Sequence, residues 1–160
     1  MSKIRGMRNS PPARSWRVTK ILLASEGRKF APEVIAKAVE MAGPGGSVHV
    51  FSIARVYGVA LGFPNPWLLP SRREWAQQRD QVADAVAAIR RAGLRAEGGV
   101  AGTRNAAKRI NAEAVRLGCE TIVMGADAPK HWLVMDLMWS QEPYRTRKKA
   151  KLPVQLVLAA

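Results

Sequence analysis

The chain has 160 residues, 48% of them hydrophobic, and a formal net charge of +14. This length favours one globular domain with its own core, and no apolar run approaches the roughly 20 residues of a membrane span. The single cysteine, Cys119, excludes an internal disulfide, and no apolar segment follows the basic N-terminus as in a secretion signal, so we expect a cytoplasmic protein.

The positive charge is concentrated in two segments. Residues 1–20 carry six Lys/Arg and no acid, residues 145–151 carry five and no acid, and subtracting these eleven from the net charge leaves +3. We expect residues 1–16 to form a basic, disordered tail and residues 17–160 to form the folded domain. A solvated extension and an attraction to nucleic acid or anionic lipid are both open for the tail.

The rest of the chain is predicted to alternate strands with helices. Short apolar runs indicate strands, and apolar residues three or four apart indicate helices. The predicted strands are 18–24, 47–56, 94–102, 119–125 and 152–159, and the predicted helices are 31–42, 71–92, 103–117 and a short one after residue 140. This order predicts an α/β fold with a parallel sheet covered by helices on both faces.

Two helix starts carry specific predictions. Ser71 and Glu74 form a capping box for the longest helix. Ser140 is predicted to cap the last helix, with Pro143 in its first turn. That helix offers little apolar surface, so we expect it to be held weakly by packing.

The loops after the first and fourth strands are the best candidates for a ligand site. In such a sheet, ligands bind beyond the carboxyl ends of the strands where the strand order reverses. Glu26 could accept hydrogen bonds from a ribose or base, and Gly125 could let backbone N–H groups approach a phosphate. A solvated carboxylate and a plain turn glycine are the alternatives. The predicted crevice consists of Ser25, Glu26, Gly27, Gly125, Ala126, Asp127 and Ser140.

Other site chemistry has no support in the sequence. There is no GxxxxGK[ST], HExxH, CxxC or GxSxG motif. His49 is expected to be a satisfied or surface residue of a strand, and His131 a loop residue. Cys119 is expected to pack as a small hydrophobe. We therefore expect no metal site and no catalytic site.

Several segments together resemble the universal stress protein (UspA-like) family. They are "KILLASEG…APEVIAKAVEMA", "TRNAAKRINAEAVRLGCETIVMG" and "LPVQLVLA", which span roughly residues 17–160. The resemblance implies a Rossmann-like, adenine nucleotide alpha hydrolase-like fold with five parallel strands in the order 3-2-1-4-5. It also implies a homodimer made through the last strand, here Val154, Leu156 and Leu158, and ATP or another adenine nucleotide as ligand.

The nucleotide motif of that family is incomplete here. Members that bind ATP carry an acidic residue after the first strand, matched by Glu26, and G-x2-G-x9-G-[ST] after the fourth, whose first glycine is Gly125. The other two glycines fall on Ala128 and Met138. Because side chains now stand where backbone would meet phosphate, we expect weak or altered nucleotide binding.

The segment that replaces the glycine motif is apolar. Residues 131–139 include Trp132 and Trp139. Extra core and a surface that docks a protein partner both fit this composition.

The sequence thus predicts a dimeric, universal-stress-type regulatory or binding protein without catalysis. Two rivals remain. One is an ATP-binding member that tolerates the broken motif, with Lys130 and Arg145 replacing lost donors. The other binds nucleic-acid phosphates through the tail and residues 145–151.

Overall fold

The computed structural model describes residues 19–55, 69–127 and 141–158. The strands are β1 (Lys20–Ser25), β2 (Ser47–Arg55), β3 (Arg95–Thr103), β4 (Thr121–Ala126) and β5 (Val154–Leu158). The helices are α1 (Pro32–Ala42), α2 (Arg72–Arg91), α3 (Ala106–Arg116) and α5 (Glu142–Lys149).

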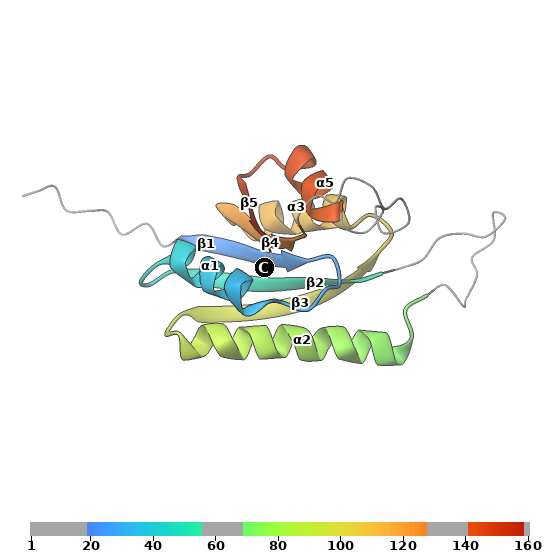
Figure 1. Cartoon of the computed structure of the whole chain (residues 1–160), viewed down its shortest axis with the longest axis horizontal. Coiled ribbons are helices and arrows are strands. Elements are labelled where there is room, and N and C mark those ends of the chain that lie inside the picture. The colour runs from blue at the N-terminus through green and yellow to red at the C-terminus, as the bar shows by residue number, and fades with distance from the viewer. Residues whose placement is uncertain (1–18, 56–68, 128–140, 159–160) are drawn as a thin grey trace, which may run out of the picture.

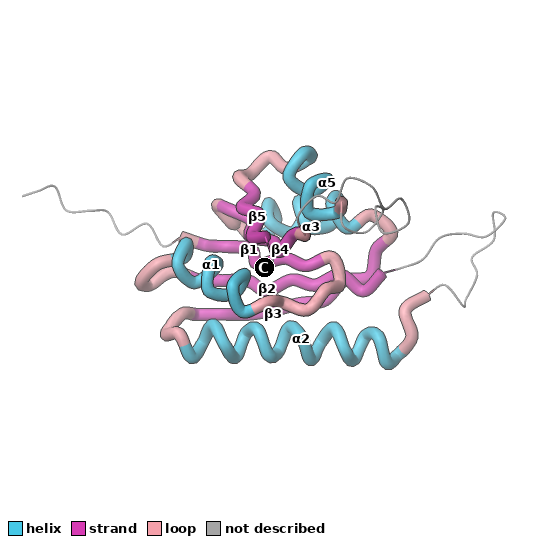
Figure 2. Tube along the Cα trace, viewed as in Figure 1, coloured by secondary structure: helices cyan, strands magenta, loops and turns pink. Residues whose placement is uncertain are grey.

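The strands form one parallel sheet in the order β3-β2-β1-β4-β5. In Figure 1, α1 and α2 lie on the near side of the sheet, with α2 along the β3 edge, while α3 and α5 lie on the far side. Figure 2 shows the same alternation of strand and helix along the chain. The predicted α/β class, strand order and two helical layers are confirmed.

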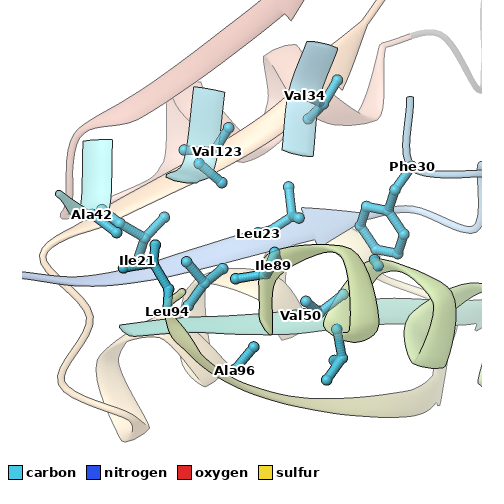
Figure 3. Packing of buried hydrophobic residues seen from close by; sticks show 14 of the residues in the cluster. Ile21, Leu23, Phe30, Val34, Ala42, Val50, Ile89, Leu94, Ala96 and Val123 are labelled. Carbon is cyan, nitrogen blue, oxygen red and sulfur yellow. The ribbon is translucent and has the colours of Figure 1, made fainter. Parts of the chain in front are cut away.

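One core fills the space between the sheet and the layer of α1 and α2. Alternate residues of the strands, such as Ile21, Leu23 and Val50, point into it and are almost fully buried. Figure 3 shows them packed against Val34 of α1 and Ile89 of α2. The alternation arises because successive side chains of a strand point to opposite faces.

A second core lies on the other face of the sheet, under α3. It contains Leu22 of β1, Phe51 of β2 and Ile110 of α3. Cys119 belongs to this cluster and is a buried, free thiol, as predicted. Burial raises the pKa of this thiol, which keeps it protonated and unreactive.

The capping box of α2 is confirmed, while the start of α3 was predicted three residues too early. Ser71 and Glu74 exchange both hydrogen bonds of the box. Thr103 is the last residue of β3, and the side chain of Asn105 caps α3 by accepting from the Lys108 N–H at 3.0 Å. Asn is a strong cap because its amide oxygen satisfies an otherwise unpaired N–H.

Two predictions about the last helix are wrong. Its N-cap is Gln141, without a side-chain cap, and Ser140 lies outside the described residues. The helix also packs on α3: Pro143 and Thr146 are buried, and the Asn111 side chain donates to the Thr146 carbonyl at 3.2 Å. A polar helix is held here because a neighbouring helix supplies both the contact and the hydrogen bond.

Other predictions fall on residues that the structure does not describe. These are the tail 1–16 and the segment 128–140, which contains Ala128, Lys130, His131 and the apolar residues 131–139.

Candidate functional site

The tips of β1 and β4 border a pocket at the carboxyl end of the sheet. Ala24 of β1 and Met124 of β4 are the last paired residues of these neighbouring strands. After β1 the chain continues through α1 to β2, so β2 lies on one side of β1 and β4 lies on the other. This is the reversal of strand order at which ligands bind in such sheets. The described residues enclose a cavity of about 130 Å³ there. Its lining includes the predicted Ser25, Glu26, Gly125, Ala126 and Asp127.

The guanidinium of Arg28 joins the two sides of this crevice. Its Nε donates to the Glu26 carboxylate, and its Nη1 donates to Asp127 Oδ2 at 2.6 Å. The side chain of Glu26 is only 2% exposed, while those of Arg28 and Asp127 are 33% and 52% exposed. Glu26 is therefore not a solvated loop carboxylate, because it is buried and its Oε1 is paired with Arg28.

One donor of Arg28 has no partner. Its Nη2 is buried and makes no hydrogen bond among the described residues. A buried, unpaired donor is costly unless something accepts from it. Lys29 also lines the cavity. The two cations balance Glu26 and Asp127, so the crevice is close to neutral and an anion meets no net repulsion.

Ser25 and Gly27 shape the loop that carries Arg28. Ser25 Oγ donates to the Arg28 carbonyl at 2.6 Å and accepts from the Gly27 N–H at 3.2 Å. Gly27 has φ +113°, and a Cβ there would lie 2.9 Å from the Ile53 carbonyl oxygen. Gly27 is not one of the residues that line the cavity. Its backbone conformation instead fixes the shape of the loop whose other residues line it.

Gly125 is a strand residue and not a turn residue. It belongs to β4 and pairs with Val157 of β5. A Cβ at this position would lie 3.2 Å from Cγ2 of Val34. The absence of a side chain at Gly125 therefore allows α1 to approach β4 closely. The interpretation of Gly125 as a plain turn glycine is wrong.

Three residues that the sequence did not single out support the crevice from β2 and α2. Gln78 donates to the Gly27 carbonyl at 3.0 Å and accepts from Ser52 Oγ at 2.6 Å. Arg55 donates to the Glu26 carbonyl at 2.8 Å. The sequence signal for a role of Arg28 in the crevice was its position two residues after Glu26. Gln78 lies far from the crevice residues in sequence, so no local pattern pointed to its role.

On the other side, α5 supports β4. Tyr144 Oη donates to the Asp127 carbonyl at 2.9 Å. Arg145 pairs with Glu142 on its own helix at 3.0 Å, so nothing in the described contacts directs it to the crevice. Arg147, Lys148 and Lys149 occupy the last turn of α5, away from the crevice end of the helix.

His49 lies within β2, as predicted, and is half-buried. Burial lowers its pKa, which the nearby Glu113 and Glu97 only partly oppose. Glu113 is itself buried and paired with Arg109 and Arg116, and the hydrogen bond from Arg116 lowers the pKa of its carboxyl.

Residues 19–55, 69–127 and 141–158 contain neither a cluster of metal ligands nor a membrane-spanning helix. No group of three or more His, Cys, Asp or Glu side chains is placed to hold a metal ion. No helix there has the length and apolar character needed to cross a bilayer.

Several solved structures that are similar to this chain are universal stress proteins. The chain is similar to one from Archaeoglobus fulgidus, at 20% identity over 86% of this chain and 92% of the other, with a TM-score of 0.64. It is also similar to one from Burkholderia pseudomallei, at 19% identity over 89% and 97%, with a TM-score of 0.64. A third match, at 18% identity over 86% and 96% with a TM-score of 0.60, is the Archaeoglobus fulgidus protein in complex with dAMP.

These likenesses show that the chain has the universal stress protein fold. No protein-family model matches the chain, and no curated protein matches it either. The likeness thus lies in the path of the backbone.

Proposed function

We propose that the chain is a universal-stress-type regulatory protein that binds an adenine nucleotide weakly at the β1–β4 crevice and catalyses no reaction. The fold supports this proposal, since one similar structure holds dAMP. The cavity of about 130 Å³ between the described residues fits a phosphate or ribose better than a whole nucleotide.

Arg28 is the observation that carries the proposal. Its paired Nε and Nη1 hold the guanidinium between the strand tips, and its buried Nη2 is left without an acceptor. A phosphate oxygen in the crevice would satisfy this donor in a charge-assisted hydrogen bond. The side chain thus replaces donors that backbone glycines would otherwise offer.

The acids of the crevice fit a regulatory rather than a catalytic role. Glu26 and Asp127 each give one oxygen to Arg28, so both carboxylates serve to hold the guanidinium in place. Incubation with ATP and Mg²⁺ is expected to release ADP no faster than buffer does. Hydrolysis that Glu26→Gln abolishes would contradict the absence of catalysis.

Calorimetric titration with AMP and with ATP tests the binding. We expect weak binding by the native protein, and a loss of affinity of about tenfold or more in Arg28→Gln, since a hydrogen bond to a charged group is worth roughly 1.5 to 3 kcal/mol. Arg104→Gln is the matched control, because Arg104 is an exposed cation at the same end of the sheet, after the edge strand β3.

Two outcomes would overturn this view of Arg28. Tighter binding by Arg28→Gln would mean that the guanidinium occupies the ligand's place. Micromolar ATP binding that is insensitive to Arg28→Gln and lost in Glu26→Ala would favour the rival in which the chain is an ATP-binding protein despite its altered glycine motif.

The proposed assembly is a homodimer through β5. This strand lies at an edge of the sheet, and Leu158 is 55% exposed. Val154 and Leu156 pack partly against the core under α3, so charges there would also disturb the fold. Leu158→Asp is the cleaner test: we expect a dimer to dissociate by mass photometry, and a dimer that persists would exclude this edge as the interface.

A further inference from the structure

A second cavity lies at the amino end of the sheet, opposite the β1–β4 crevice. It has a volume of about 170 Å³, and its lining includes Lys20, Ser47, His49, Arg95 and Glu97. In Figure 1 this end is at the left, where β1 and β3 begin and α2 ends.

Strand register places its polar residues side by side. Lys20, Ser47 and Arg95 are direct partners across β1, β2 and β3, so their side chains leave the same face of the sheet. Two residues further along, His49 and Glu97 form the next row on that face. Because neighbouring strands lie about 4.8 Å apart, Lys20 and Arg95 flank Ser47 at roughly 10 Å from each other, within reach of one shared ligand.

The cations of this row differ from Arg28 in having no acidic partner. Among the described residues, neither Lys20 nor Arg95 forms an ion pair, although Glu97 lines the same cavity. Arg95 is exposed and Lys20 is half-buried. The pair therefore has free charge and free donors to offer an anion.

The same end of the molecule collects further positive charge. Helices that connect parallel strands end where the strands begin, so their last turns lie around this cavity's end of the sheet. The exposed cations there are Arg91 of α2, Lys148 and Lys149 of α5, and Lys151 before β5. The exposed acids there are Glu40 of α1, Glu97 of β3 and Glu120 before β4, so the cations outnumber them once Lys20 and Arg95 are included.

We propose that Lys20, Ser47, His49 and Arg95 form a phosphate-binding site, and that its occupant is a phosphate of a nucleic-acid backbone. Lys20 and Arg95 supply charge, and Ser47 Oγ and the His49 ring supply neutral hydrogen bonds. A lone phosphate needs only these groups, whereas the surrounding cations would be matched by a polymer of phosphates. Such binding carries no direct base readout, so we expect little sequence preference.

Fluorescence anisotropy with an arbitrary 20-base-pair DNA duplex tests the proposal on the full chain. The pair Lys20→Gln/Arg95→Gln is compared with Arg72→Gln/Arg73→Gln, which removes the same charge from the start of α2 at the opposite end. The first pair is expected to weaken binding about tenfold or more and to lower the slope of log affinity against log salt by up to about 2. The second pair is expected to change the DNA affinity by about one third of a log unit, which is less than threefold.

Three results would overturn the proposal. They are an absence of DNA binding, equal weakening by the two variant pairs, and binding that does not change with salt. A titration with inorganic phosphate separates the two sources of the ligand: saturation by phosphate without any DNA binding would exclude the nucleic acid. AMP affinity should be unchanged in Lys20→Gln/Arg95→Gln, so a failure here is distinguishable from a failure of the nucleotide crevice.

Discussion

Among the residues that the structure describes, both ends of the sheet carry basic and acidic residues, but only at the carboxyl end do these residues form ion pairs across a pocket. At the carboxyl end, Arg28 is fixed between Glu26 and Asp127. At the amino end, Lys20 and Arg95 flank Ser47 without an ion pair in the described parts of the chain. Net charge therefore says little about where an anion binds, since the pairing of each cation decides whether its charge is available.

The difference follows from how a parallel α/β fold distributes its connections. Strand tips at the carboxyl end lead into loops that lie close together, and Gln78 and Arg55 reach into them from α2 and β2. Helix ends at the amino end meet the start of strands, where a basic residue also interacts favourably with the helix dipole. We therefore expect a ligand at the carboxyl end to lie in a closed-in pocket, and the cavity at the amino end to lie within a broader positive surface.

The largest effect is expected from Gly27→Ala at the carboxyl end. Its φ of +113° and the 2.9 Å approach to the Ile53 carbonyl make any Cβ strained, so we expect a loss of about 2 kcal/mol or more in the free energy of unfolding. Gly118→Ala is the control at the amino end: φ is +66° with nothing within 4 Å, so the loss should be about 1 kcal/mol. Urea unfolding measures both losses of unfolding free energy. Equal losses in Gly27→Ala and Gly118→Ala would contradict the contrast between a packed loop and an open one.

A smaller effect is expected from Glu113→Gln in α3. Glu113 is buried and pairs with Arg109 and Arg116, so its neutral replacement should cost about 1 kcal/mol at pH 7. Because Arg116 holds the pKa of Glu113 below its ordinary 4.5, this stability is present above pH 4.5 and is lost as pH falls through the lowered pKa. The native and variant proteins should thus converge in stability in acid.

The same variant sharpens the comparison of the two ends. Without Glu113, Arg109 and Arg116 lose their ion pairs, and Arg116, in the last turn of α3, joins the free cations near the amino end. DNA affinity should rise in Glu113→Gln while AMP affinity stays unchanged. Weaker DNA binding by a folded variant would show that paired cations, and not free ones, carry the interaction.

The smallest effect is expected from His49→Gln. Burial lowers the pKa of His49 below its ordinary 6.5, so the unfolded chain takes up a proton more readily than the folded one. The native protein should lose stability relative to the variant as pH falls below 6.5, and their difference should be constant above it. A difference that grows toward high pH would contradict this assignment of the shift.

The sequence predicted the fold better than it predicted the site. Alternating apolar runs and the capping box of Ser71 are local patterns, and the strands and α2 followed from them. The rule that ligands bind at the carboxyl ends of strands also predicted that Glu26 and Gly125 border one crevice. The roles of Arg28 and of the row Lys20, Ser47 and Arg95 depend on partners in other elements, so no local pattern could reveal them.

The most direct test of the two-ended account is to map AMP and duplex DNA separately onto assigned amide resonances of the full chain. The account predicts that AMP shifts Ser25, Glu26 and Asp127, while DNA shifts Lys20, Ser47 and Arg95, each leaving the other set unchanged. Shifts of one shared set by both ligands would show that a single anion site serves them, and would contradict the account.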